Sequence, residues 1–351
     1  QKTLLSSINS CLEKSKRAED KKSVAFFQNA KQLIEADTLK VLHISDTNTK
    51  GLKGPCIPGT PFHSLVKSTG VSNKDQPTSG GSFGIGKNAV YAISDLQTVF
   101  YSTIYKNDSG EDKFLAQGKS ILISHSDGND ESRRATGYWG MEGFSPIKDR
   151  STVPKWLSRE EQGTSIYAIG FREIENWQYR MAASLIINFF VAIHREEMVF
   201  RLSDPDIKID KSSLYELFNN ASIISAAYES NQADELQYAS FLYECLTSEE
   251  SKETKFTIPD IGEVSVRVLI KDKLPKRLSL IRNGMVITDS LEKFGDRFRS
   301  FPMYKDFVAL VEPLDETGST LIKTLENPKH DGLSAERITD EYDRNKATIA
   351  V

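Results

Sequence analysis

Apolar residues recur at helical spacing in the first 36 residues of the chain. In the runs 4–12 and 23–36 they fall three and four positions apart, which predicts two helices. The charged run 13–22 between them indicates a solvated turn. The next apolar stretch, Leu39–Ser45, is short and rich in branched residues. We expect a buried strand there, ending at the polar, glycine-containing turn that begins with Asp46.

The segment 51–86 is rich in Pro and Gly, and it predicts a long loop with one short helix at 61–70. Beyond it, the predicted elements are a helix over 87–96 and strands over 98–105, 119–125 and 163–171. Residues 126–160 are polar and predict irregular structure, although the aromatic pair Tyr138 and Trp139 lies inside them.

The second half of the chain mixes long helices with short strands. A helix is predicted over about Ile174–His194. Its apolar stripe, which we interpret as core packing, consists of Met181, Leu185, Ile186, Phe189, Phe190 and Ile193. The other predicted elements are strands over 198–204, 264–270, 278–287 and 307–313, and helices over 212–220 and 233–246. The sequence therefore predicts an α+β protein of two domains, 1–173 and 174–351.

Composition and charge narrow the class of protein. The chain has 351 residues, 38% of them hydrophobic and 27% charged, with a net charge of −4, all ordinary for a globular protein. The bulk charge does not predict a nucleic-acid binder, and no apolar run reaches the ~18 residues of a membrane span. The cysteines Cys11, Cys56 and Cys245 are far apart and form no Cys/His cluster, which predicts reduced thiols in a cytoplasmic protein and no metal site.

The run SGGSFGIGKNAVYAIS, Ser79–Ser94, has the composition of a phosphate-binding loop. Gly81, four residues, Gly86 and Lys87 nearly spell a P-loop. A P-loop requires Ser or Thr at the next position to hold Mg²⁺, whereas this chain has Asn88. The polar residues before the run also do not predict the buried strand that a P-loop follows. The run is therefore not a P-loop.

Three pieces of sequence, in order, suit another kind of nucleotide pocket. A carboxylate at a strand end, such as Asp46, can accept a hydrogen bond from the exocyclic amine of adenine, and guanine has a carbonyl at that place. Gly51 allows the turn a positive φ beside a ligand. The run Gly81–Gly86 lets backbone N–H groups approach phosphate, and the dipole of the following helix adds to the attraction. Thr164 can support Asp46 directly or through water.

These pieces resemble the GHKL ATPases, the superfamily of gyrase, heat-shock chaperone, histidine kinase and MutL. Gly81-x-x-Gly84-x-Gly86 matches its lid motif, and GTSIYAIGF matches its later Gly-Thr. DTNTKGL is a variant of its Asp-x-Gly-x-Gly box, because Asn48 replaces a glycine and Gly51 comes one position late. Together with RNGM and ENPKHDGLS (Glu326–Ser334), DTNTKGLKG looks closest to the MORC- and MutL-like proteins of prokaryotic restriction and phage-defence operons. The resemblance covers most of the chain.

The resemblance implies a GHKL (Bergerat) ATP-binding α/β sandwich, followed by a transducer-like α+β domain of the ribosomal S5 domain 2 type. It implies ATP and Mg²⁺ as cofactors. The implied nucleotide-binding residues are Asp46, Asn48, Gly51, Leu52, Ser72, Lys74, Gly81, Ser82, Phe83, Gly84, Ile85, Gly86, Lys87, Thr164 and Lys276. Ser72 and Lys74 would belong to the lid, and Lys87 either meets a phosphate or stays solvated. Lys276 or Arg277, beside Pro275, would reach the γ-phosphate from the second domain.

In this superfamily a helix with a catalytic Glu and a Mg²⁺-binding Asn precedes the Asp box, and the sequence shows no such helix. Asn29 lies in AFFQNAKQL, but the residue four positions earlier is Ala25. We interpret Asn29 as an ordinary exposed helix residue, and we expect the Glu/Asn helix to precede Gln1. No residue of the chain is assigned to catalysis.

The implied function is a Mg-ATP-binding ATPase that acts as a nucleotide-driven, dimerising switch or clamp in antiviral defence or restriction. A partner effector protein is implied, and contact with DNA is left open. One alternative is a nucleotide sensor or scaffold that does not hydrolyse its ligand. Another is a MutL-like DNA-repair ATPase. His330, in NPKHD, is interpreted as a structural or partner-contact residue.

Overall fold

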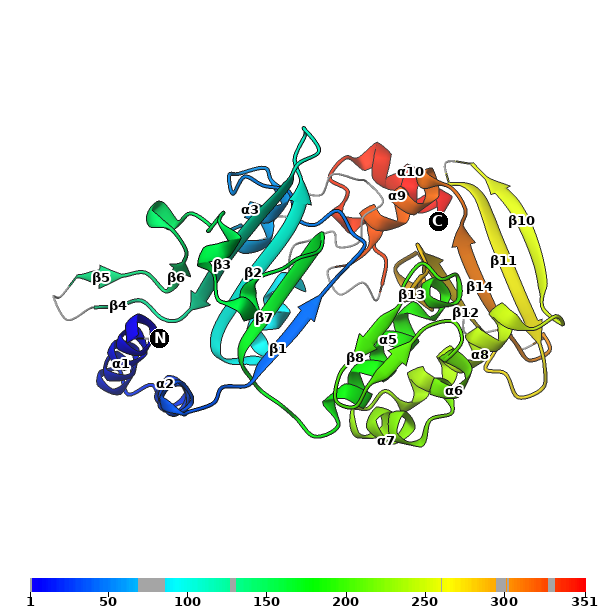
Figure 1. Cartoon of the computed structure of the whole chain (residues 1–351). Coiled ribbons are helices and arrows are strands. Elements are labelled where there is room, and N and C mark those ends of the chain that lie inside the picture. Colours follow the sequence, from blue (N-terminus) through cyan, green and yellow to red (C-terminus); the bar gives the residue numbers. More distant parts are fainter. Residues whose placement is uncertain are drawn as a thin grey trace. The chain divides into compact units, whose positions relative to one another are not determined.

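The computed structural model describes residues 2–68, 86–126, 131–259, 261–294, 301, 303–327 and 332–351. They form two compact units, which divide between Glu173 and Ile174 (Figure 1). We call these unit 1 and unit 2. Each combines helices with a mainly antiparallel sheet, which confirms the predicted α+β class.

Unit 1 is built on a five-stranded antiparallel sheet in the order β1-β7-β2-β3-β6. Its strands are β1 (Val41–Ser45), β2 (Ser94–Lys106), β3 (Asp112–Ile121), β6 (Thr136–Trp139) and β7 (Gly163–Phe171), and β4 (His125–Ser126) pairs with β5 (Ser132–Arg133) in a separate ribbon. Its helices are α1 (Lys2–Arg17), α2 (Lys21–Glu35), α3 (Pro61–Val66) and α4 (Ala89–Ala92), with 3₁₀ turns η1 (Gly86–Asn88), η2 (Glu142–Phe144), η3 (Arg150–Thr152) and η4 (Lys155–Leu157).

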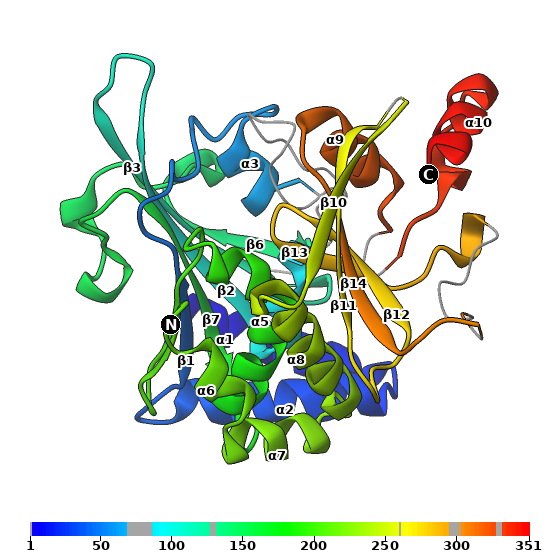
Figure 2. The ribbon, with the colours of Figure 1, turned by 90° about the vertical axis from the view of Figure 1, so that its right-hand side faces the viewer.

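Different helices cover the two faces of the unit 1 sheet (Figures 1 and 2). The predicted helices at the N-terminus are α1 and α2, and they pack on one face through apolar side chains that include Ile8, Phe27 and Ile34. The short helices α3 and α4 pack on the other face through Phe62 and Tyr91. We call this second face the α3–α4 face.

Strand β1 is not the buried strand that the sequence predicts. It lies at the edge of the sheet, paired with β7 alone among the described strands. Leu42 is buried, but Val41 and Ile44 are 42% and 41% exposed. A short apolar run has the same pattern whether it becomes a central or an edge strand, so only the strand order could decide its burial.

The helix predicted over 87–96 is also wrong in its length. Residues 86–92 form η1 and the single turn α4, and β2 already begins at Ser94. The hydroxyl of Ser94 donates to Ile169 O of β7, so sheet pairing overrides the local helical pattern. The segment predicted as irregular contains an added strand, β6, which carries Tyr138 and Trp139.

Unit 2 contains a five-stranded sheet in the order β10-β11-β14-β12-β13, in which only the β12–β14 pair is parallel among the described strands. Its strands are β10 (Lys252–Ile258), β11 (Gly262–Ile270), β12 (Arg277–Arg282), β13 (Met285–Thr288) and β14 (Phe307–Pro313), with β8 (Phe200–Leu202) and β9 (Ile207–Ile209) as a separate pair. Its helices are α5 (Trp177–His194), α6 (Leu214–Phe218), α7 (Ala221–Glu229), α8 (Ala233–Thr247), α9 (Glu316–Leu325) and α10 (Glu341–Ala350), with 3₁₀ turns η5 (Glu292–Phe294) and η6 (Ala335–Arg337).

The main core of unit 2 lies between its sheet and α5 to α8. The apolar stripe of α5 is in this core, since Ile186, Phe190 and Ile193 are fully buried, although Met181 is 36% exposed. A smaller cluster joins α9 and α10 to residues of β12 and β13. Two apolar layers therefore hold the sheet of unit 2 between helices.

A single strand is predicted over 278–287, whereas the structure has a hairpin there. Asn283 and Gly284 have φ values of 49° and 69°, the positive values that a type I′ turn requires. Strand β12 therefore ends before this pair and β13 begins after it. An ideal Cβ on Gly284 would lie 2.6 Å from Cβ of Ala192, so helix packing also excludes a side chain here.

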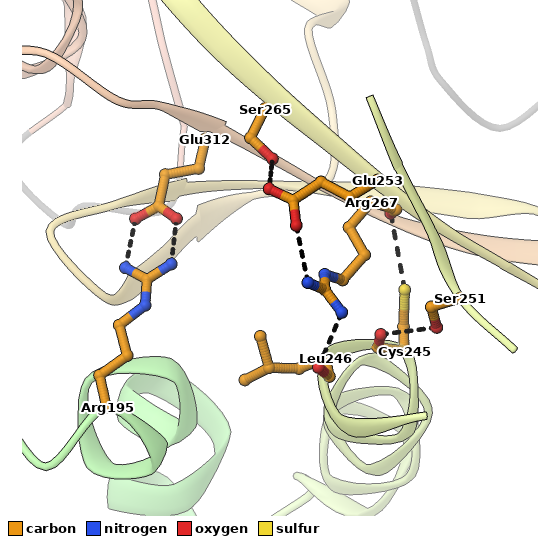
Figure 3. Close-up of polar contacts among 8 residues, drawn as sticks. All are labelled: Arg195, Cys245, Leu246, Ser251, Glu253, Ser265, Arg267 and Glu312. Atoms are coloured by element: carbon orange, nitrogen blue, oxygen red, sulfur yellow. Dashed lines mark hydrogen bonds and ion pairs between the residues drawn. The ribbon is translucent and has the colours of Figure 1, made fainter. Parts of the chain in front are cut away.

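Ion pairs connect the elements of unit 2. Figure 3 shows both terminal nitrogens of Arg195, just after α5, donating to the Glu312 carboxylate of β14 at 2.9 and 2.5 Å. Arg267 of β11 donates to the Glu253 carboxylate at 2.7 Å and to Leu246 O, at the end of α8, at 3.2 Å.

A further pair in unit 2 is completely buried. The guanidinium of Arg282, in β12, makes a two-pronged contact with the carboxylate of Glu326, just after α9. The side chains are 1% and 0% exposed. This pair joins the RNGM and ENPKHDGLS pieces of the sequence. Among the described helices, none is long and apolar enough to cross a membrane.

Candidate functional site

Asp46 is held where the edge strand β1 ends beside the start of β7. Its backbone N–H donates to Thr164 O at 3.0 Å, which continues the β1–β7 pairing by one step. Its carboxylate oxygen Oδ1 accepts hydrogen bonds from the backbone N–H of Thr164 and from the hydroxyl of Thr49, both at 2.7 Å. The backbone of Thr164 therefore supports Asp46, where the sequence suggested its hydroxyl.

The second carboxylate oxygen of Asp46, Oδ2, accepts no hydrogen bond from the described residues. Asp46 is an exposed residue. Two donors on Oδ1 restrict the orientation of the carboxylate. The arrangement therefore presents one fixed acceptor to solvent, which suits an amine donor on a ligand.

Two glycines allow the chain to approach Asp46 closely. Gly163 has φ +138°, and an ideal Cβ there would lie 2.4 Å from Asp46 O and 2.6 Å from Asp46 Oδ1. Gly51 has φ +64°, and its Cβ would lie 2.1 Å from Ile104 O of β2. A side chain at either position would displace the neighbouring backbone, so both positions require glycine.

Thr103, which the sequence analysis did not single out, connects the turn after Asp46 with the start of β7. We call this region the Asp46 corner. Thr103 is fully buried in β2 opposite Thr164. Its hydroxyl donates to Gly163 O at 2.9 Å and accepts from Leu52 N–H at 2.8 Å. One side chain thus fixes the turn after Asp46 to the beginning of β7. Only the register of β2 against β7 could have revealed this role.

Arg159 is a second residue that the sequence did not reveal. Its side chain donates to Asp46 O at 2.7 Å, to the Ser165 hydroxyl at 2.6 Å and to Glu161 O at 3.2 Å. The residue is 8% exposed, and among the described residues it forms no ion pair with a carboxylate. The positive charge of Arg159 is therefore stabilised by neutral hydrogen-bond acceptors, one of which is the backbone carbonyl of Asp46.

The hydrogen bonds of Arg159 continue to the face of the sheet that α1 and α2 cover. Ser165 Oγ lies 3.0 Å from Nε2 of His43, and the His43 ring stacks on Tyr167 with ring centres 4.3 Å apart. Burial, and then the charge of Arg159, lower the pKa of His43. Because Ser165 accepts from Arg159, its own proton is available to a neutral His43.

The other predicted site residues are distributed as follows. Asn48, in the Asp46 turn, has φ +58° and is exposed. Lys87 is half-buried, and its ammonium donates to Ser64 O at 2.6 Å. Lys276 belongs to unit 2, where its ammonium lies 3.4 Å from an Asp306 oxygen. Gly86 begins η1. Outside the described residues lie Ser72, Lys74, Gly81, Ser82, Phe83, Gly84 and Ile85.

The expected contribution of a helix dipole at Gly86 is not supported. The element that follows is the 3₁₀ turn η1 and a four-residue helix, α4. So short a helix aligns few peptide dipoles, and its first N–H groups gain little from them. Any anion binding at this place must rest on side-chain charge and on single N–H groups.

Mg²⁺, which the resemblance implies, requires several oxygen ligands. In residues that the structure describes, no group of three His, Cys, Asp or Glu side chains comes together. Asp46 Oδ1 already accepts two hydrogen bonds. The described residues therefore do not fit a Mg²⁺ site made of protein ligands, and we assign Mg²⁺ no role in a reaction mechanism. Asn29 is exposed on α2, as expected of an ordinary helix residue.

Comparison with known proteins adds a distant likeness in structure. No family model matches the chain, and no curated protein matches it. Among solved structures, the B-subunit of the DNA gyrase from Myxococcus xanthus is similar, with a TM-score of 0.37 and 8% sequence identity, over 88% of this chain and 78% of that one. At this distance the likeness carries no functional argument, so function is argued from the residues themselves.

Proposed function

We propose that the chain binds ATP at Asp46 and acts as a GHKL-type ATPase. The observation that carries the proposal is the Asp46 carboxylate, which has one oxygen held by Thr164 N–H and Thr49 and the other open to a ligand. An acceptor fixed in this way favours the exocyclic amine of adenine over the carbonyl of guanine, because two acceptors that face each other form no hydrogen bond.

The order of the motifs supports the finer proposals. The Asp box, the glycine-rich run and the Gly-Thr pair follow one another as in the GHKL ATPases, and two of them meet at Asp46 and Thr164. On this basis we propose a nucleotide-driven, dimerising switch in antiviral defence or restriction, with Lys276 reaching the γ-phosphate and Mg²⁺ accompanying ATP. Partner proteins and DNA contact belong to the same proposal.

The test is calorimetric titration of a non-hydrolysable ATP analogue into the wild type and Asp46→Asn, with a GTP analogue as the second ligand. The asparagine can keep its carbonyl oxygen toward Thr164 and Thr49, so that the open position changes from an acceptor to a donor. We expect adenine affinity to fall roughly tenfold to a hundredfold, the range of one hydrogen bond to a charged group. Asp95→Asn, which removes a carboxylate paired with Arg172 in unit 1, is the matched control. Wild-type protein that binds no ATP analogue would refute the proposal.

Binding without hydrolysis is the second candidate. It is favoured by the lack of an assigned general base, since Asp46 is committed to its two donors. Phosphate release under single-turnover conditions separates the two candidates. ATP binding without phosphate release identifies a sensor, whereas phosphate release that is lost in Asp46→Asn identifies an ATPase.

A further inference from the structure

A buried lysine in the unit 1 sheet has no anionic partner among the residues that the structure describes. Lys119, in β3, is 9% exposed. Among the described residues it makes neither an ion pair nor a hydrogen bond, and its ammonium lies 5.9 Å from the centre of the Tyr91 ring. Burying an ammonium group is costly unless an opposite charge or strong acceptors compensate for the lost water. The position of Lys119 therefore needs an explanation beyond the fold itself.

Other basic side chains gather near Lys119. Lys87 contributes to lowering the pKa of Lys119, after the larger effect of burial. Burial, and then the charges of Lys67 and Lys87, likewise lower the pKa of His63. The ammonium of Lys67 lies 5.4 Å from the centre of the Tyr138 ring, and Tyr138 is the β6 partner of Lys119. We call Lys67, Lys87 and Lys119 the lysine cluster.

Polar aromatic rings lie beside the lysine cluster. The hydroxyls of Tyr91 and Tyr101 lie 3.0 Å apart and are buried. Burial raises the pKa of Tyr101 to about 12 and raises that of Tyr91 as well, so both stay neutral. One hydroxyl donates to the other, which leaves a single O–H that can donate to a ligand. Within the described ranges, neither Lys67 nor Lys119 pairs with a carboxylate. Positive charge and an O–H donor without negative charge suit an oxyanion ligand.

The sheet register relates this cluster to the Asp46 corner. Lys119 pairs with Val99 of β2, and Thr103 lies four residues further along that strand, opposite Thr164. Side chains two residues apart in a strand share a face, so Lys119 and Thr103 both lie on the α3–α4 face. Four residues along and three strand spacings across place the Cα atoms of Lys119 and Asp46 roughly 20 Å apart. A lysine side chain shortens this span, and an extended nucleoside triphosphate can then bridge it.

We infer that Lys119, with Lys67 and Lys87 beside it, binds the phosphate groups of the nucleotide whose base is held at Asp46. The inference rests on the proposed function and adds the residues that select for phosphate. The base end of the site uses a carboxylate with one open oxygen, and the phosphate end uses a cation, Lys119, that no described carboxylate pairs with. An anionic ligand completes the lysine cluster, and the cost of burying Lys119 is then compensated.

The test compares the wild type with Lys119→Met and Lys119→Arg by calorimetry, using adenosine and a non-hydrolysable ATP analogue. Lys113→Met is the matched control, because Lys113 lies in the same strand, is exposed and pairs with Glu111 at 2.8 Å. We expect Lys119→Met to weaken binding of the ATP analogue roughly tenfold to a hundredfold, as for loss of a charged hydrogen bond. Adenosine affinity is expected to stay unchanged, Lys119→Arg to retain most of the triphosphate affinity, and Lys113→Met to behave as the wild type.

Two results would overturn the inference. One is a folded Lys119→Met protein that binds the ATP analogue as tightly as the wild type. The other is an equal loss for adenosine and the analogue, because a merely structural role would affect both ligands alike.

A wild type that binds neither adenosine nor the analogue would refute the proposed function separately. Inorganic tripolyphosphate then decides the inference without the base. A rise in the melting temperature with tripolyphosphate that disappears in Lys119→Met supports a phosphate site at the lysine cluster, and no rise in the wild type rejects it.

Discussion

Each unit of this protein buries a cation in its sheet, and of these two cations only the one in unit 2 has a carboxylate partner among the described residues. In unit 2, Arg282 meets the carboxylate of Glu326, and neither side chain is exposed by more than 1%. In unit 1, Lys119 is 9% exposed and has no carboxylate partner among the described residues. The charge in unit 2 is paired within the fold, whereas we expect the charge in unit 1 to lower the stability of the ligand-free protein. That difference assigns a structural task to Arg282 and a binding task to Lys119.

The largest expected effect is on the buried pair of unit 2. Glu326→Gln leaves the Arg282 guanidinium buried without its counter-charge, and we expect the free energy of unfolding to fall by about 3–5 kcal/mol. Urea denaturation measures the loss, and hydrogen exchange of β12 assigns it to unit 2. Glu196→Gln removes one partner of the exposed Lys211–Glu196 pair and should cause no measurable change. Equal effects of the two substitutions would contradict the comparison.

The second prediction concerns the unpaired cation of unit 1 in the absence of ligand. Lys119→Met replaces a buried ammonium with an apolar side chain of similar length, and we expect it to stabilise the ligand-free protein by about 1–2 kcal/mol. Thermal unfolding without nucleotide measures the gain. A lower melting temperature would mean that Lys119 supports the fold, as Arg282 does, and the contrast between the units would disappear.

A third prediction examines the neutral hydrogen bonds that hold the Asp46 corner. Thr103→Val keeps the shape of the side chain but removes its contacts with Gly163 O and Leu52 N–H. We expect a loss of about 1–3 kcal/mol in the free energy of unfolding, because two buried backbone groups lose their partner. Thr103→Ser keeps the hydroxyl and should lose much less. Denaturation curves for the two variants give the difference, and identical curves would show that the hydroxyl is unimportant.

The smallest expected effect is a pH dependence of unit 1. Burial, and then the charge of Lys87, lower the pKa of Lys119, and the neighbouring Tyr91, Tyr101 and Tyr138 have raised pKa values. Above the lowered pKa, the folded state binds fewer protons than the unfolded chain, whose lysines titrate near 10.4.

Below about pH 10, where unfolded tyrosines begin to ionise, ligand-free stability should therefore rise with pH, while affinity for a triphosphate falls because the ammonium loses its charge. At higher pH the raised pKa values of the three tyrosines act on stability in the opposite direction. Lys87, whose pKa is also lowered by burial, contributes in the same direction. Melting temperatures and calorimetry across this pH range measure both trends, and Lys119→Met should flatten each of them. If Lys119→Met shows the same pH dependence of melting temperature and affinity as the wild type, another group is responsible for the titration.

The sequence predicted much of the local structure and pointed to part of the candidate site. The spacing of apolar residues indicated α1, α2 and α5, and the order of the motifs pointed to Asp46, Gly51 and Thr164. Prediction from the sequence failed where the pairing of strands decides which structure a segment adopts. An edge position exposes β1, and pairing with β7 makes Ser94 the first residue of β2 in place of a helix. The Asn283-Gly284 pair is typical of a hairpin turn. The sequence analysis nevertheless predicts a single strand through it.

The sequence by itself determined which chemical groups this protein can use: a carboxylate after a strand, glycines with positive φ near it, and lysines around a glycine-rich run. Only the tertiary structure decided which of these groups meet. Thr103, Lys119 and Arg159 have no distinguishing local pattern, because their roles come from strand register and from the turn before β7. Register brings residues far apart in the chain to neighbouring strands, and burial then determines whether a charge is paired or left for a ligand.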